Sequence, residues 1–157
     1  MNRSKQVFLK WAGFIGIAVF FGFGSVLAVG LPGFSKIKTV KPVNGVVTIP
    51  VDQVLDGKAH FYQLVDGGKN ISFFVVKGTD GAVHVAFDAC DVCFQEKKGY
   101  LQEGNFMVCR NCSMKFATNK IGPMAGGGCN PSPLNFVQDT KTIAIKADDL
   151  KSGARFF

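Results

Sequence analysis

Short apolar runs broken by turn-forming residues dominate the chain after residue 45. Four consecutive runs rich in Val, Ile, Phe and Tyr predict strands at 45–50, 60–65, 71–77 and 83–87. Asp66-Gly67-Gly68 and Asp80-Gly81 lie between consecutive runs, and such residues supply the positive φ angles of tight hairpin turns. We therefore expect these strands to form an antiparallel meander.

Two further runs, 106–108 and 142–146, continue the strand pattern, and residues 147–150 predict a single helical turn before Gly153. The predicted fold class is mainly β. We expect a small antiparallel β domain with a cysteine-rich knuckle insert between its fourth and last strands, preceded by one N-terminal transmembrane helix.

The stretch from Trp11 to Leu31 carries no charge and predicts the transmembrane helix. About 20 residues, each rising about 1.5 Å, cross a hydrocarbon core about 30 Å thick. The basic residues Arg3, Lys5 and Lys10 precede the stretch and favour a cytoplasmic N-terminus. The alternative is a cleaved signal, because Val26-Leu27-Ala28 offers small or modest residues to a peptidase.

The chain is expected to divide into three parts. Residues 1–31 form the cytoplasmic N-terminus and membrane anchor (or uncleaved signal), 32–44 a linker, and 45–157 one extracytoplasmic domain. We expect a single-pass protein of the cell inner membrane, whose C-terminal domain faces the periplasm or cell exterior.

Composition favours a packed globule, because 47% of residues are apolar and 18% are charged. The net charge of +7 raises the question of nucleic acid. Three basic residues precede the apolar stretch, and the other 15 basic and 11 acidic residues leave about +4, spread along the chain. We expect no nucleic-acid partner.

The cysteines form the strongest chemical pattern, C-x2-C-x15-C-x2-C, followed by one more cysteine. They are Cys90, Cys93, Cys109, Cys112 and Cys129. In this spacing each pair forms a tight knuckle, and the intervening hairpin brings two thiolates from each knuckle to one ion. Four thiolates suit zinc, a single iron or an iron–sulfur cluster, and the spacing leaves all three open.

Two alternatives use the same cysteines without metal. Outside the cytoplasm the pairs could close as disulfides, and a bridge within Cys-x-x-Cys is typical of a redox-active dithiol. A thiol–disulfide oxidoreductase is therefore the second hypothesis. Cys129, in the segment Gly126-Gly127-Gly128-Cys129, is predicted to be a fifth ligand or a substitute for one of the other four.

Other candidate ligands carry less weight. Thioethers bind Cu(I), but Met107, Met114 and Met124 are more typical of core packing. His60 and His84 lie in predicted strands, where a histidine is usually a hydrogen-bonded structural residue. No nucleophile, phosphate-loop or paired-carboxylate motif is present, so we expect an electron-transfer or metal-binding protein rather than an enzyme.

Several motifs resemble the FtrD-like family of membrane iron–sulfur-containing proteins. They are FDACDVC (87–93), KGY (98–100), MVCRNC (107–112), GGCNPSPL (127–134), the stretch FFVV (73–76) and the closing Phe156-Phe157. The resemblance runs from about Asp56 and carries the five cysteines over as metal residues. Ser113 stands where knuckle geometry favours glycine for a positive φ.

The resemblance implies electron transfer in support of bacterial iron uptake, with an iron permease or periplasmic redox proteins as partners. One point opposes an iron–sulfur cluster: clusters are assembled in the cytoplasm, and folded export normally requires a twin-arginine signal, whereas Arg3 stands alone. The cofactor is therefore an iron–sulfur cluster or a single ion of iron, zinc or copper. A zinc- or copper-binding module without redox function is the third hypothesis.

Overall fold

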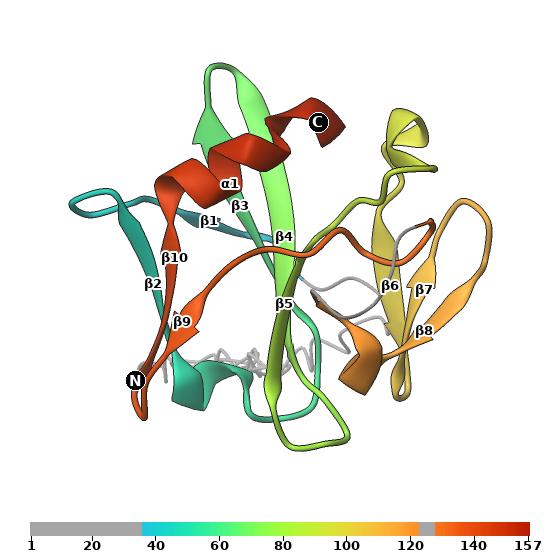
Figure 1. The fold of residues 1–157 in the computed structure, drawn as a ribbon, viewed down its shortest axis with the longest axis horizontal. Helices are drawn as coiled ribbons and strands as arrows, with labels where there is room; N and C mark the ends of the chain where they lie inside the picture. The colour runs from blue at the N-terminus through green and yellow to red at the C-terminus, as the bar shows by residue number, and fades with distance from the viewer. Residues whose placement is uncertain (1–35, 123–127) are drawn as a thin grey trace, which may run out of the picture. The chain divides into compact units, whose positions relative to one another are not determined.

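The computed structural model describes residues 36–122 and 128–157, and these residues form ten strands in three small sheets (Figure 1). The first sheet has the order β1 (Lys38–Val40), β3 (His60–Asp66), β4 (Lys69–Lys77) and β5 (Val83–Phe87). The second has the order β2 (Val46–Pro50), β10 (Thr142–Lys146) and β9 (Val137–Gln138). The third has the order β6 (Tyr100–Glu103), β7 (Phe106–Cys109) and β8 (Lys115–Ala117).

The mainly β fold class and the β3–β4–β5 meander are confirmed. The strands β3 and β4 pair from His60↔Val75 to Asp66↔Lys69, which leaves Gly67 and Gly68 as the two turn residues. Their φ angles of 55° and 79° are those of the tight turn that the sequence predicts. The helical turn also forms, as α1 (Ala147–Ser152).

Two pairings differ from the expected meander. Strand β2 pairs antiparallel with β10, not with β3, because buried Val47 and Ile49 oppose buried Ile145 and Ile143 across the pair. Strand β1, within the predicted linker, pairs parallel with β3, so the first sheet is not wholly antiparallel.

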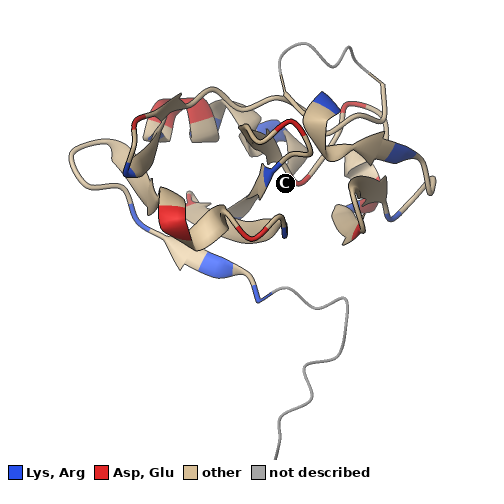
Figure 2. Ribbon diagram, turned by 90° about the horizontal axis from the view of Figure 1, so that it is seen from below, with Lys and Arg blue, Asp and Glu red and all other residues tan. Residues whose placement is uncertain are grey.

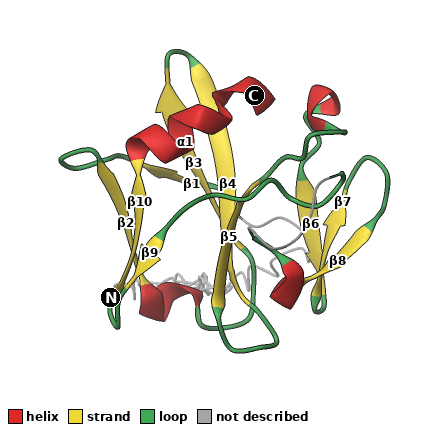
Figure 3. Ribbon diagram, viewed as in Figure 1, coloured by secondary structure: helices red, strands yellow, loops and turns green. Residues whose placement is uncertain are grey.

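The cysteine-rich insert contains a sheet of its own. Antiparallel pairing of β6, β7 and β8 replaces the expected loops over much of 100–117. Between β5 and β6 the chain is loop apart from one 3-10 helix, Phe94–Glu96 (Figure 3). The strands β1, β6, β8 and β9, none longer than four residues, lack the apolar runs that predicted the others.

The first sheet, which contains β4, is buried on both faces. Side chains alternate along β4: Phe73 and Val75 join a core with β2, β10 and α1, whereas Phe74 and Val76 join a second core with the cysteines. This double burial explains why 71–76 is almost continuously apolar instead of alternating. The sheet therefore provides a rigid floor for the cysteine insert.

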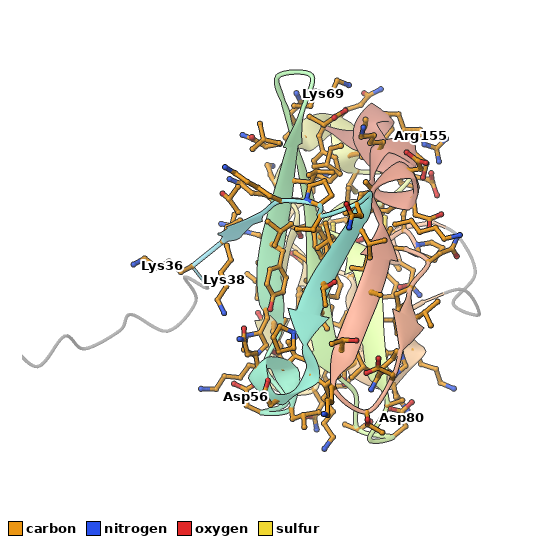
Figure 4. The ribbon with its side chains drawn as sticks, turned by 90° about the vertical axis from the view of Figure 1, so that its left-hand side faces the viewer. Lys36, Lys38, Asp56, Lys69, Asp80 and Arg155 are labelled. Carbon is orange, nitrogen blue, oxygen red and sulfur yellow. The ribbon has the colours of Figure 1, made fainter. Side chains whose placement is uncertain are left out.

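Three more 3-10 helices complete the described fold: Val51–Val54, Thr118–Lys120 and Gly153–Phe156. The last lies beside the tip of the β3–β4 hairpin, where the Lys69 ammonium donates to the Ala154 carbonyl at 2.7 Å. Figure 4 shows Lys69 and Arg155 near the same end, with Asp56 and Asp80 near the other. Basic and acidic residues are interspersed over the described strands and loops (Figure 2).

The predicted membrane helix, 11–31, lies outside the described residues. Within 36–122 and 128–157, every helix is too short or too polar to span a bilayer.

Candidate metal centre

The five cysteines come from three separate segments. Cys90 and Cys93 form the first knuckle (90–93), which follows β5 and ends at the 3-10 helix Phe94–Glu96. Cys109 and Cys112 form the second knuckle (109–112), in the turn from β7 to β8. Cys129 lies on the segment that returns past β5.

All five cysteines are free, and their sulfurs gather into two overlapping trios. One trio contains Cys90, Cys93 and Cys129, the other Cys93, Cys109 and Cys112, and the sulfurs within each lie within 4.8 Å of one another. Cys93 belongs to both trios. The Sγ atoms of Cys93 and Cys129 are 3.7 Å apart, well beyond the disulfide length of about 2.05 Å.

The first knuckle stabilises negative charge on sulfur. The backbone N–H of Cys93 donates to the Cys90 Sγ at 3.2 Å. Burial opposes thiolate formation at Cys90, but hydrogen bonds to its sulfur, first that of the Cys93 N–H and then that of the Val92 N–H, outweigh it and lower the pKa of Cys90. The Cys90 thiol therefore loses its proton more readily, and the thiolate is the form that binds metal.

The second knuckle has the backbone that its sequence spacing predicts. Ser113 has a φ of 61°, in the left-handed region where glycine is usual. Its N–H donates to the Cys109 carbonyl at 2.9 Å, and the Cys109 N–H donates to the Met114 carbonyl at 3.0 Å. Serine thus adopts the conformation that the pattern reserves for glycine, and the knuckle shape is kept.

A short backbone ladder positions Cys129. The Phe87 N–H donates to the Ser132 carbonyl, and the Ser132 N–H donates to the Ala89 carbonyl, both at 2.9 Å. A bridge between Ala86 and Pro133 continues the pairing. Because the same stretch of β5 leads into Cys90, the ladder fixes the fifth cysteine relative to the first knuckle.

Tyr100 lies against the trio of Cys90, Cys93 and Cys129. Its ring is 4% exposed and packs near Phe74 and Phe116, with ring centroids 6.3 and 6.5 Å away. Its hydroxyl donates to the Cys129 carbonyl at 2.5 Å. Burial, then the hydrogen bond with Cys90 and the nearby sulfurs, raise the pKa of Tyr100, so the phenol remains a neutral donor.

The sulfurs also influence one another. Burial, followed by hydrogen bonds from Cys112 and Cys93, raises the pKa of Cys129. Crowded thiols cannot all ionise without a compensating positive charge. The donor set therefore favours binding of a cation that displaces the protons.

Asp88 is a residue at the site that sequence reasoning missed. Its carboxylate accepts from the Tyr100 N–H at 2.7 Å, and burial raises its pKa to about 7. It packs against Gly99, where a Cβ would lie 2.5 Å from a carboxylate oxygen. Asp88 and Gly99 lie within the FDAC and KGY motifs, and these two motifs were the sequence signal that could have indicated a role for Asp88 at the site.

Exposure changes across the centre. Cys90 and Cys109 are 1% and 2% exposed, Cys93 and Cys129 are half-buried, and Cys112 is exposed. The second core covers the inner sulfurs with Phe74, Met107 and Tyr100. Cys112 is consequently the cysteine of the centre nearest to solvent.

The histidine and methionine candidates have other surroundings or roles. His60 pairs with Asp56 at 2.7 Å, and His84 bonds the Ile121 carbonyl at 2.7 Å and Asp80, as expected of structural histidines. Met107 is wholly buried in the second core and Met114 is exposed. Met124 lies outside the described residues.

Comparison with known proteins gives one match. The profile of a family described as "Membrane iron-sulfur containing protein FtrD-like" matches residues 54–157, about two thirds of the chain. Neither the curated proteins nor the solved structures yielded a match.

Proposed function

We propose, since the chain belongs to the FtrD-like family of membrane iron–sulfur-containing proteins, that its five cysteines hold an iron–sulfur centre that relays electrons. The observation that supports this most directly is the pair of sulfur trios joined at Cys93. A thiolate-bound tetrahedral ion with bonds of about 2.3 Å separates its sulfurs by about 3.8 Å. The 3.7 Å between Cys93 and Cys129 fits that spacing.

Five sulfurs exceed the four that one tetrahedral ion accepts. Two ions would be held by the two trios, one by Cys90, Cys93 and Cys129 and the other by Cys93, Cys109 and Cys112. Iron bound in this way supplies one-electron redox chemistry. The two knuckles hold the thiolates, and the ladder from β5 holds Cys129 without relying on the metal.

The surrounding residues adjust the potential and control access. The Cys93 N–H donates to the Cys90 sulfur, and a hydrogen bond to a ligand sulfur would favour the more reduced centre. The Tyr100 hydroxyl donates to the Cys129 carbonyl and so helps to position that cysteine. The second core keeps water from Cys90 and Cys109. Electrons therefore enter or leave most directly at exposed Cys112.

The cellular role follows from the family resemblance and the predicted anchor. A single helix at 11–31 would hold the domain at the inner membrane, facing the periplasm or cell exterior. A permease or a periplasmic redox protein of an iron-uptake system would be its partner. In that role the protein is an electron carrier and not an enzyme.

Anaerobic purification of the full chain tests the proposal. We expect about two irons per chain, acid-labile sulfide, and charge-transfer absorption that bleaches reversibly on reduction. A colourless protein with one zinc per chain, insensitive to reductant, would replace the relay with a structural site. Copper that survives dialysis in place of iron would instead support a copper-binding module.

One observation supports a second candidate, a thiol–disulfide oxidoreductase. Cys93 and Cys129 are free and 3.7 Å apart, close enough to form a disulfide after small shifts. The two thiols would release two protons and pass two electrons to a substrate disulfide, which is reduced to two thiols. Metal-free protein with a reversible dithiol potential would favour this function over the relay.

A further inference from the structure

A cavity of about 670 Å³ opens beside the buried side of the centre. Its floor includes Cys90, Cys93 and Cys109, and its walls come from the β3–β4 hairpin tip, the stretch before β6 and the final residues. The volume lies within the range of about 300–1,000 Å³ that is usual for small-molecule sites. The proposed electron relay makes no use of this cavity.

The lining is strongly basic, unlike the interspersed charges elsewhere (Figure 2). Lys69, Lys97, Lys98 and Arg110 line the cavity, and Asp88 is the only carboxylate side chain among the lining residues. The register of the third sheet explains the gathering. Tyr100 pairs with Cys109, and the Arg110 N–H donates to the Gly99 carbonyl at 3.0 Å, so Lys97 and Lys98 approach Arg110.

Two of these cations remain available for a ligand. Lys69 donates to the Ala154 carbonyl at 2.7 Å, and Lys98 donates to Asn111 at 2.9 Å. Among the described residues, neither the Lys97 ammonium nor the Arg110 guanidinium makes a side-chain hydrogen bond or a close ion pair, although Arg110 lies near enough to Asp88 for their charges to interact. Lys97 is also held out of the preceding 3-10 helix by its left-handed φ of 50°.

The Asp88 carboxylate does not fill the cavity. It accepts the Tyr100 N–H and packs against Gly99, so it is held at the floor. Aromatic side chains make up another part of the wall: Phe94 and Phe156 are in edge contact at 5.7 Å between ring centroids. Apolar surface next to paired cations suits an organic anion better than a hydrated inorganic one.

We propose that this cavity binds a small organic anion with two or more carboxylates, contacted by Lys97 and Arg110. Arginine accepts a carboxylate through two parallel N–H bonds, and lysine adds a point charge to a second carboxylate. The bound anion lies beside Cys90, Cys93 and Cys109, which line the same cavity. This inference depends on the cavity alone, not on the identity of the metal.

Titration calorimetry on the full chain tests the proposal with tricarballylate, a tricarboxylate that lacks the chelating hydroxyl of citrate. Lys97→Gln and Arg110→Gln should each weaken binding by about tenfold, as expected for loss of one charge-assisted contact. Lys141→Gln is the matched control, because it removes an exposed charge from the β9–β10 turn, away from the cavity. Its affinity should equal that of the unmodified protein.

Metal content is measured for each variant. This measurement distinguishes a variant that binds tricarballylate more weakly from one that has lost its metal. Three outcomes would overturn the proposal: no tricarballylate binding, equal weakening by Lys141→Gln, or binding of inorganic phosphate as tight as tricarballylate. Binding of polyglutamate without tricarballylate would also overturn it and would assign the basic rim to an acidic protein partner.

Discussion

Cys93 differs from the other cysteines because it is a member of both sulfur trios. At the residue scale, replacement of Cys93 therefore tests whether the centre holds two ions. We predict that Cys93→Ser abolishes iron binding, since neither trio then keeps three sulfurs. Cys112→Ser leaves the trio of Cys90, Cys93 and Cys129 intact and should retain about half of the iron.

Iron and sulfide per chain are the measurements for both variants. Cys112 is exposed, so its replacement by the isosteric serine disturbs packing little and serves as the comparison. Equal iron retention by the two variants would contradict the shared role of Cys93.

Ser113 carries a conformational cost that glycine would remove. An L-residue in the left-handed region costs about 1–2 kcal/mol, while glycine loses about 0.4–1 kcal/mol through greater freedom in the unfolded chain. We predict that Ser113→Gly raises the free energy of unfolding by about 0.5–1 kcal/mol, measured by denaturant titration. Ser113→Ala retains a Cβ at the same φ of 61° and should give no gain.

Residue types and spacing predicted that the cysteines come together, and their sulfurs do. The C-x2-C pairs identified four cysteines and the left-handed φ at 113, and the glycine-rich surroundings brought in Cys129. Asp88 and Tyr100 could not be assigned in the same way. Their roles depend on the pairing of 99–100 with 109–110, a contact between segments that local patterns do not specify.

At the scale of elements, β4 separates the two cores with adjacent phenylalanines. Both Phe73 and Phe74 are fully buried, but only Phe74 shares a core with the cysteines. We predict that Phe73→Leu and Phe74→Leu each lower the free energy of unfolding by about 1–2 kcal/mol. Only Phe74→Leu should alter the absorption and potential of the centre.

The two variants are matched in chemistry, burial and strand, so each is the control for the other. A spectral change of the same size in Phe73→Leu would show that packing changes in the first core also reach the cysteines, contrary to the prediction.

Strands were predicted correctly where the sequence has a long run of apolar residues. They were missed where a short, more polar segment is held in the sheet mainly by hydrogen bonds to a neighbouring strand. The doubly buried run of β4 and the Gly67-Gly68 turn were local signals. Strand β1 has only one half-buried residue, Val40, and forms because β3 offers a free edge. The partner of β2 is β10, about 95 residues later, and local periodicity does not identify so distant a partner.

At the scale of the whole molecule, Asp88 makes stability depend on pH. Its folded pKa of about 7 lies above its ordinary value of 3.8, so the folded protein retains a proton that the unfolded chain has lost between those values. The free energy of unfolding therefore falls as pH rises from about 4 to 7, by about 2 kcal/mol after allowance for its partial exposure.

Denaturant titrations at several pH values check this, and Asp88→Asn should flatten the profile. Asp139 gives the opposite sign, because N–H groups of Lys141 and Thr142 lower its pKa and its contribution is lost as pH falls. Asp139→Asn should consequently leave the decline between pH 4 and 7 in place. If the free energy of unfolding of Asp88→Asn falls between pH 4 and 7 as much as that of the unmodified protein, another titrating group is responsible.

The pairing of β2 with β10 has a consequence for biosynthesis. The first core cannot close until β10 has emerged, when nearly the whole chain has been made. The second core, which contains the cysteines, is built among the described residues from 59–129, so all of its segments are made before β9 and β10. The core that contains the cysteines can therefore assemble while the first core is still open.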